Sequence, residues 1–358
     1  MRSELGPRVA AALWRRQIVE ILRAWRMSDA HAEVVADVLL AADLMGIDSH
    51  GMTLLPLYDQ QIRDGGATPT PNISVVHDQA AVALIDGDSG FGHVPAMLAV
   101  ELAAERAEKF GIAAVAIRNS NHYGAAGVYV RRLAEQGLIG ISTSSVWRAA
   151  IVPTGGLEPK LGTNPIAFAA PSAGGKPFLL DMATSNAAIG KLKLAQRAQV
   201  DIPEGWALTR EGTPQRDPSL ALLDALLVPL GGHKGYGLAT MVEVLSSALS
   251  GAALTPLRGT PGRRHDVGHF VMALDPAMIR GSRAEFAVDV GRMTDALRAT
   301  PPSNPEFPVL VAGDPEYACE AERLSHGIPL SAKLAVQLRD IAERTNAAFL
   351  LEPERAPT

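Results

Sequence analysis

The sequence predicts an α/β fold preceded by a helical N-terminal region, and three observations lead to that prediction. Apolar side chains recur at helical spacing up to residue 44, and short β-branched runs alternate with helical segments from residue 73 onward. The length of 358 residues allows two or three domains with a sizeable core. The composition, 47% hydrophobic and 20% charged, is that of a globular chain rather than a disordered or fibrous one.

The N-terminal region is expected to hold two helices, over residues 9–25 and 30–44. Ser28 is a good N-cap for the second helix, and the acidic Asp29 suits the positive end of its dipole. Gly46 is expected to end this helix. The next residues, GIDSHGMT, form a polar loop.

The remainder of the chain is expected to alternate strands and helices. The expected strands are short runs within residues 73–86, then residues 112–118, 138–145, 166–170, 178–181 and 269–275. The expected helices are residues 96–110, 125–135, 185–199, 238–249 and 283–299, and residues 301–308 are read as a linker into a last strand and two terminal helices. Two segments rich in proline, glycine and charge, residues 201–218 and 255–266, are expected to be exposed loops.

Charge and composition exclude several classes of protein. The chain has 33 Lys plus Arg against 38 Asp plus Glu, a net charge of −5, which argues against a nucleic-acid partner. The single cysteine, Cys319, excludes an intrachain disulfide framework and any multi-thiolate metal site, and we predict no metal. We find no cleavable signal and no run of about 20 nearly uninterrupted apolar residues, so we expect a cytoplasmic protein without a membrane partner.

The sequence contains neither of the two common phosphate-binding fingerprints. Gly90 and Gly92 are followed by Pro95 where a Rossmann fingerprint needs its third glycine, and Gly175-Lys176 is followed by proline where a P-loop needs Ser or Thr. The segment GGHKGYG, residues 231–237, offers backbone amides and Lys234 just before a helix, as an anion site does. A tight turn whose glycines adopt unusual dihedrals explains the segment equally well.

Two of the nine histidines lie in polar, glycine-flanked loops, where an imidazole can reach a ligand. They are His50 in DSHG and His122 in NSNHYG, and either can exchange a proton with a hydroxyl during hydride transfer. His122 follows a strand and precedes a helix, which is where ligand crevices open in α/β domains. A structural hydrogen bond remains the alternative for each. Hydrolysis through Ser49 is disfavoured, since no G-x-S-x-G elbow is present.

Seven ordered blocks of the sequence resemble one family. The blocks are GIDSHG, SNHYGAAG, LGTNPIAFAAP, LLDMATSNAAIGK, VPLGGHKGYGLATMVEVLSSALSGA from residue 228, GHFVMALDP, and GDPE with GIPL. Together, between residues 41 and 330, they resemble the type 2 malate/L-lactate dehydrogenase family. This group is similar to ureidoglycolate dehydrogenase, sulfolactate dehydrogenase, diketogulonate reductase and delta-1-piperideine-2-carboxylate reductase.

The resemblance implies a non-Rossmann nicotinamide oxidoreductase that uses NAD or NADP and forms a homodimer. By the same resemblance Thr163 and Asn164 lie near the substrate, and the cofactor is lined by Tyr123, Gly124, Ala125, Ala126, Gly127, Ser145, Asp181, Met182, Ala183, Lys234, Gly313, Asp314 and Pro315. It also implies three regions: an N-terminal helical region (1–72), a discontinuous substrate-side domain (73–122 plus 301–358) and an NAD(P)-binding domain (123–300).

The family offers two accounts of the proton donor, and this chain departs from its pattern twice. One account uses Ser49 and His50 with a distant aspartate, whose position is Lys191 here, and the other uses His122. Both remain open, with a slight preference for His50. The arginine expected four residues after His50, which would pair with a substrate carboxylate, is Leu54. Arg148 is a candidate replacement, unless it is simply a surface or interface residue.

The resulting hypothesis is a dehydrogenase or reductase acting on a small 2-hydroxy or 2-oxo acid. A reductase of cyclic imine acids is the nearest alternative among enzymes, because the same site then protonates nitrogen instead of oxygen. A non-catalytic nucleotide-binding homologue is the alternative from another class, suggested by the missing arginine at Leu54.

Overall fold

A mixed sheet of seven strands forms the centre of the molecule. The computed structural model describes residues 6–258 and 264–351. The strand order is β2-β3-β4-β10-β5-β6-β7, in which only β3 and β4 are parallel neighbours. The strands are β2 (Ser74–Gln79), β3 (Val82–Asp86), β4 (Ile112–Ser120), β10 (Val267–Leu274), β5 (Ile139–Ser144), β6 (Ile166–Ala170) and β7 (Phe178–Met182).

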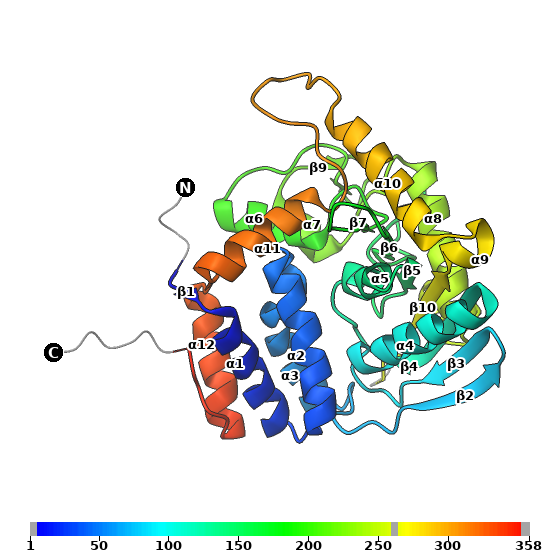
Figure 1. Cartoon of the computed structure of the whole chain (residues 1–358). Coiled ribbons are helices and arrows are strands. Elements are labelled where there is room, and N and C mark those ends of the chain that lie inside the picture. The colour runs from blue at the N-terminus through cyan, green and yellow to red at the C-terminus, as the bar shows by residue number, and fades with distance from the viewer. Residues whose placement is uncertain (1–5, 259–263, 352–358) are drawn as a thin grey trace.

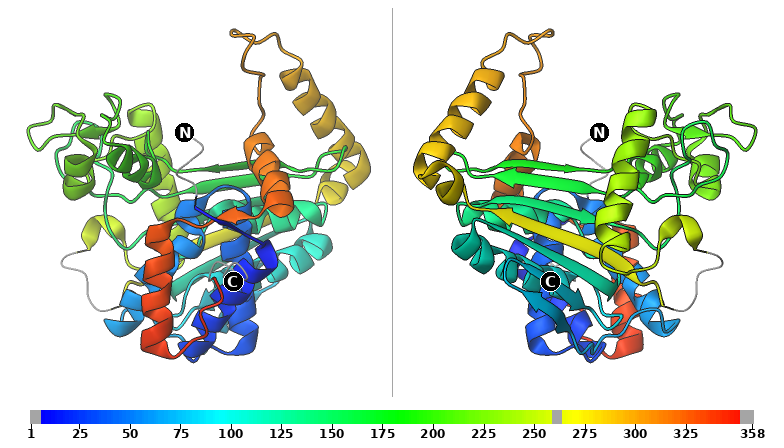
Figure 2. Two further views of the ribbon diagram at one scale, coloured as in Figure 1. Left: turned by 90° about the vertical axis from the view of Figure 1, so that its left-hand side faces the viewer. Right: turned by 90° about the vertical axis from the view of Figure 1, so that its right-hand side faces the viewer.

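Helices cover both faces of this sheet and extend from one edge (Figures 1 and 2). Helices α4 (His93–Phe110) and α5 (Ala126–Glu135) pack on one face through a core rich in alanine, valine and isoleucine. Helix α8 (His233–Glu243), continued by a π-helical turn (Val244–Ala248), covers the other face. After α9 (Pro276–Arg280), helix α10 (Arg283–Arg298) and the chain up to residue 313 project as an arm (Figure 2).

A helical cluster joins the two ends of the chain. Helices α1 (Ala11–Ala24), α2 (Asp29–Leu44) and α3 (Leu55–Arg63) pack with α12 (Ala332–Thr345) around buried Trp14, Tyr58 and Leu338. The short strands β1 (Arg8–Val9) and β11 (Ile328–Pro329) pair beside it, and α11 (Asp314–His326) lies across the top of α2 (Figure 1). The expected N-cap is confirmed, because the Ser28 side chain accepts a hydrogen bond from the His31 amide.

The expectation of an exposed loop over residues 201–218 is correct only in part, because most of these residues are exposed while others are buried or carry regular structure. This segment carries the paired strands β8 (Ala207–Leu208) and β9 (Pro214–Gln215) and leads into α7 (Pro218–Asp224). Its Ile202 and Ala207 are buried with α6 (Ile189–Ala198) in a small third core. Polar and charged residues dominate the segment, so its few apolar anchors were not recognisable without their partners.

Three smaller expectations also need correction or restriction. The helix expected from residue 238 begins at His233, so most of the glycine-rich segment lies within its first turns. Among the described residues, no strand lies between residue 308 and α11, where one was expected. The last strand is β11, which lies between the two terminal helices. The loop expected over residues 255–266 begins with a 3-10 turn, Thr255–Leu257, while residues 259–263 of that prediction lie outside the described residues.

The proposed division into domains remains a prediction. The single sheet takes β2, β3 and β4 from one side of the boundary at residue 122 and its other four strands from the other side. Among the described residues, no helix is long and apolar enough to cross a membrane.

Candidate active site

The loop that carries Ser49 and His50 is anchored from beneath by a buried carboxylate. The loop forms two 3-10 turns, Asp48–His50 and Met52–Leu54, directly after α2. Asp43, only 1% exposed, accepts hydrogen bonds on one oxygen from the Met52 amide (2.8 Å) and from Trp14 Nε1 (2.6 Å). Burial raises the pKa of Asp43 to about 7, because water no longer solvates its charge. A Cβ at Gly51 would lie 1.9 Å from Asp43 Oδ1, so only glycine fits there.

A second clamp reaches the same loop from α11. The Arg323 guanidinium pairs with the Asp48 carboxylate and also donates a hydrogen bond to the Asp43 carbonyl oxygen. Arg323 is 8% exposed, and its hydrogen bond and ion pair with Asp48 outweigh burial and raise its pKa. The loop that carries Ser49 and His50 is therefore held by elements 280 residues apart in sequence.

His122, after β4, is held in one tautomer by its neighbours. Its Nδ1 accepts a hydrogen bond from the Gly124 amide (3.2 Å), so Nδ1 carries a lone pair and the proton resides on Nε2. The hydroxyl of Tyr58, on α3, lies 2.9 Å from the same Nδ1 and consequently acts as a second donor. This arrangement leaves Nε2–H of His122 as a donor for a bound molecule.

The structure brings the two predicted histidines together. The rings of His50 and His122 are stacked, with centroids 5.5 Å apart and planes 30° apart. Ser49 Oγ lies 2.8 Å from His50 Nδ1. Burial lowers the pKa of His50 to about 4, aided by the charge of Lys193, and burial followed by neighbouring histidines lowers that of His122. Both imidazoles are therefore neutral at pH 7 when no ligand is bound.

Three buried residues that support His122 were missed by the sequence analysis. Tyr58 is fully buried, and its hydroxyl also lies 3.4 Å from Nε2 of His93, at the start of α4. His269, on the central strand β10, is bonded on both ring nitrogens, to Ser144 (2.8 Å) and to Ser120 (3.1 Å). Neither histidine lies in a polar loop, which was the signal used to find the other two: His93 precedes Val94 and Pro95 just before an expected helix, and His269 begins an expected strand.

Several residues of the expected cofactor site lie close together, at the start of α5, the end of β7 and the turn before α11. The Gly127 amide, in the first turn of α5, donates to Asp181 Oδ2 (2.7 Å) near the end of β7. Burial raises the pKa of Asp181 to about 6. The turn at Gly313 lies against β7, since a Cβ there would be 3.1 Å from Leu179. The Asp314 carboxylate is already paired with Arg298 (2.8 and 3.0 Å), so it is not a free ligand.

Tyr123 and Ser145 have structural contacts of their own. The Tyr123 ring, 2% exposed, is sandwiched between Tyr129 (4.8 Å) and His269 (4.4 Å), and its hydroxyl meets Ser142. Ser145 and Gly268 exchange hydrogen bonds between neighbouring strands (3.0 Å). A cofactor could therefore reach Tyr123 through its backbone, not through the aromatic ring.

The start of α8 meets the requirements of an anion-binding site. Gly231 and Gly232 have φ values of 58° and 66°, and a Cβ on Gly232 would meet no atom within 4 Å, so the backbone there is open. Lys234 is exposed, and within the described residues its ammonium has no ion pair. The Asn164 amide donates to the Ala239 carbonyl of this helix (2.9 Å), yet its buried oxygen has no partner. The open start of α8 fits a phosphate group, and the unsatisfied Asn164 oxygen, beside the second half of the same helix, fits an amide donor of a bound molecule.

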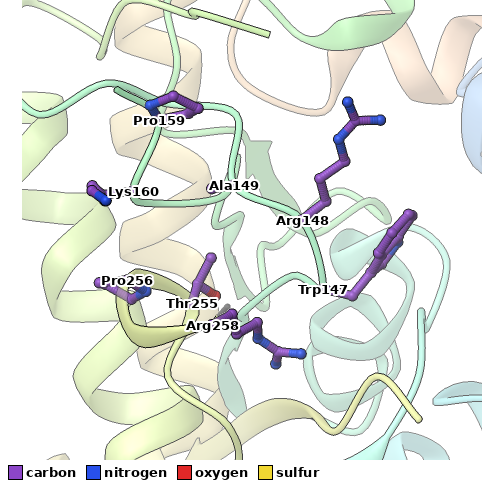
Figure 3. A pocket seen from close by; sticks show the side chains of 8 residues that line it. All are labelled: Trp147, Arg148, Ala149, Pro159, Lys160, Thr255, Pro256 and Arg258. Carbon is purple, nitrogen blue, oxygen red and sulfur yellow. The ribbon is translucent and has the colours of Figure 1, made fainter. Parts of the chain in front are cut away.

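Arg148 lies in a different setting from the histidine pair. It lines a cavity of about 440 Å³ together with Trp147, Lys160 and Arg258, and these cations occupy separate sides of it (Figure 3). Trp147 stacks on His265 with centroids 4.6 Å apart. Within the described part of the chain, Arg148 makes no contact with His50 or His122. Leu54 packs against the N-terminal helical core.

Among the described residues, no cluster of three His, Cys, Asp or Glu side chains could hold a metal.

Comparisons with known proteins agree with this fold. The malate/L-lactate dehydrogenase family model matches residues 9–339. Malate dehydrogenase of Pyrococcus abyssi is 42% identical over 93% of each chain, and L-sulfolactate dehydrogenase of Methanocaldococcus jannaschii is 38% identical over 91% of this chain and 94% of the other. The crystal structure of malate dehydrogenase from Entamoeba histolytica superimposes with a TM-score of 0.92 at 31% identity, covering 96% of this chain and 99% of that one.

These findings establish a dehydrogenase built on a non-Rossmann α/β fold with a nicotinamide cofactor. The chain belongs to the malate/L-lactate dehydrogenase family. It is an oxidoreductase that acts on the CH–OH group of a hydroxy acid.

Proposed function

We propose that the protein transfers a hydride between NAD or NADP and C2 of a small 2-hydroxy or 2-oxo acid, with His50 and His122 handling the hydroxyl proton. The observation that carries this proposal is the stacked pair of neutral imidazoles, in which His122 has a fixed tautomer. When bound, the nicotinamide supplies the hydride acceptor or donor.

The two histidines have different parts in this proposal. In oxidation, C2–H and O–H of the hydroxy acid break and a C=O double bond forms. His122 Nε2–H donates a hydrogen bond to the substrate oxygen, because its Nδ1 is already engaged by Gly124 and Tyr58. His50 takes the proton on Nε2 while its Nδ1–H donates to Ser49 Oγ, and it returns the proton in reduction. Position 191, in α6, is a lysine, so no aspartate at that position can complete a proton relay with Ser49 and His50.

The nicotinamide cofactor would be held by the start of α8 and by the α5, β7 and α11 junction. Lys234 and the open Gly231–Gly232 backbone suit a phosphate, while the Asn164 oxygen is free to accept from an amide. Residues 124–127, Asp181, Met182, Ala183 and the turn at 313–315 would line the remainder, with Thr163 close by.

A reduction screen tests the proposal. Loss of NADH or NADPH absorbance is followed with pyruvate, oxaloacetate, other 2-oxo acids, a 2,3-diketo acid and a cyclic imine acid. We expect turnover on a 2-oxo acid, and the preferred coenzyme is read from the same data. Turnover on the imine alone would identify the alternative reductase. Cofactor binding without turnover on every acceptor would favour the non-catalytic homologue.

Variants of the two histidines test their roles. We expect His50→Ala to lower kcat by about 10²-fold or more, the usual effect of removing a general acid-base group. His122→Ala removes one hydrogen bond to the developing charge and should cost a comparable or smaller factor. Equal and mild losses in both variants would refute the assignment of proton transfer to this pair.

We further propose a homodimer, supported by apolar side chains on the projecting arm. Leu297, Phe307 and Leu310 are 50%, 67% and 57% exposed there, more apolar surface than an isolated arm favours. A molar mass of about twice 37.7 kDa by light scattering is expected.

A cytoplasmic location remains a prediction, to be checked by cell fractionation.

A further inference from the structure

Helix α6 lies directly against the catalytic loop. A Cβ on Gly190, in the first turn of α6, would lie 3.2 Å from Ser49 Cβ and 3.3 Å from Ser49 Oγ. Ser49 Oγ in turn lies 2.8 Å from His50 Nδ1. The face of α6 that carries Gly190 is therefore the face turned toward the histidine pair.

Lys193 lies on that same face, one turn along the helix. Residues three apart on a helix are neighbours, whereas residues two apart point to different sides, so Lys193 is the next side chain beyond Gly190 toward the loop. Its side chain is exposed, and within the described residues its ammonium forms no ion pair. The charge of Lys193 reaches His50, since it contributes to the lowered pKa of that imidazole.

The other cationic side chains near the site either pair with other groups or lie in a different part of the structure. Arg323 is committed to Asp48 and to the Asp43 carbonyl. Arg148 lines the cavity beside Trp147, and Leu54 supplies no charge. Lys191, the neighbouring lysine on α6, follows Gly190 by one residue and has no such effect on His50. Lys193 is thus the cation that the described structure offers next to the reacting position.

We propose that Lys193 binds the substrate carboxylate adjacent to the reacting carbon and so restricts the enzyme to 2-hydroxy and 2-oxo acids. This inference rests on the function proposed above. The carboxylate of such an acid is one bond from the carbon whose hydroxyl faces His50, so a cation beside His50 is also close to that carboxylate. A flexible ammonium on an open helix face pairs with a carboxylate without the fixed fork of an arginine.

Pairing also prepares His50 for its part in the reaction. An unpaired Lys193 disfavours the protonated imidazole, because two positive charges repel each other. A bound carboxylate neutralises Lys193 and adds its own negative charge, which favours protonation of His50. The substrate thereby moves the basicity of His50 toward the neutral range, where proton transfer is most effective.

The variants Lys193→Gln and Lys191→Gln, with Lys193→Arg as the conservative change, test the proposal. Lys191→Gln is the matched control, because it removes an exposed lysine from the same helix on a different side. For Lys193→Gln we expect KM for the 2-oxo acid to rise by about 10- to 100-fold, the usual effect of losing a charge-assisted hydrogen bond. Lys191→Gln should stay within about twofold of the wild type, and Lys193→Arg should recover most of the loss.

A binding measurement supplies a readout independent of turnover. Oxamate, a carboxylate analogue of pyruvate, is titrated calorimetrically into each variant saturated with reduced coenzyme. Affinity for oxamate should fall by the same factor in Lys193→Gln and not in Lys191→Gln. In the acid limb of the kcat/KM profile, the apparent pKa of His50 should move upward in Lys193→Gln, because the repelling charge is gone.

The outcomes separate this inference from the proposed function. A wild-type enzyme that turns over a 2-oxo acid, with Lys193→Gln and Lys191→Gln indistinguishable in KM and oxamate affinity, overturns the inference alone. A loss confined to dicarboxylates such as oxaloacetate, absent with pyruvate, also overturns it, because the cation would then bind the distal group. No turnover of any 2-oxo acid by the wild type overturns both. If Lys193→Gln failed to fold, Lys193→Arg must keep oxamate affinity near the wild-type value, and a loss there refutes the proposal.

Discussion

Tyr58→Phe removes one buried hydroxyl that contacts His122 and leaves the aromatic ring in place. The hydroxyl lies 2.9 Å from His122 Nδ1, and the ring is fully buried at 4.7 Å from that of Phe91, so phenylalanine keeps the packing. His122 Nδ1 keeps the Gly124 amide as a donor, while His93 Nε2 loses its 3.4 Å contact with the hydroxyl. The expected cost is that of one net hydrogen bond, about 1 kcal/mol, or a fall in Tm of about 1 to 2 °C for 358 residues.

The effect on catalysis should be of similar size. If the hydroxyl only orients His122, kcat should fall about five- to tenfold, since about 1.4 kcal/mol corresponds to tenfold in rate. The pKa of Tyr58 is raised well above its usual value by burial, so the hydroxyl stays protonated and should add no alkaline limb to the pH profile.

Steady-state kinetics and thermal melts of Tyr58→Phe and of a matched control check this reasoning. Thr294→Val serves as the control, because it removes a buried hydroxyl that donates to the Gly291 carbonyl (2.9 Å) on the arm helix α10. It should cost similar stability and leave kcat unchanged. A loss of 10²-fold or more in Tyr58→Phe would refute an orienting role, because it would place Tyr58 in proton transfer itself. An unchanged kcat would show that Gly124 alone fixes His122.

The contacts of Asp43 with the loop that carries Ser49 and His50 give two further predictions. Asp43 has a folded pKa of about 7 against an unfolded value near 3.8, so its contribution to stability is present below pH 4 and is lost as the pH rises through 7. Asp43→Asn can keep both hydrogen bonds on one oxygen, so its stability relative to wild type should increase between pH 4 and 8, on the order of 3 kcal/mol in denaturant titrations. A pH-independent difference would mean that the Asp43 carboxylate is not destabilised by burial. Gly51→Ala places a methyl group 1.9 Å from Asp43 Oδ1, so it should displace the loop and lower kcat/KM by at least about tenfold. Unaltered kinetics in Gly51→Ala would contradict the rigid placement of this loop.

Local patterns in the sequence were sufficient for most of the secondary structure and for the two histidines. Ser28 capping α2, Gly111 ending α4 at a φ of 82°, and the buried run of β4 are short-range features that a linear reading detects. His50 and His122 stood out because each lies in a polar loop next to glycine. The ordered sequence blocks likewise led to the family that the comparisons establish. The buried side chains within residues 201–218 were not predicted, because Ile202 is buried only through contacts with residues elsewhere in the chain.

The sequence by itself determined the helix and strand segments, the absence of a Rossmann fingerprint and the types of residue available for chemistry, because these depend on neighbours along the chain. Only the tertiary structure decided that His50 and His122 stack, that Tyr58 and the Gly124 amide fix the tautomer of His122, and that the charge of Lys193 acts on His50. It also decided that Asp43 and Arg323, 280 residues apart, hold one loop. Such contacts join segments distant in sequence, and their distances and burial set the pKa values on which the chemistry depends.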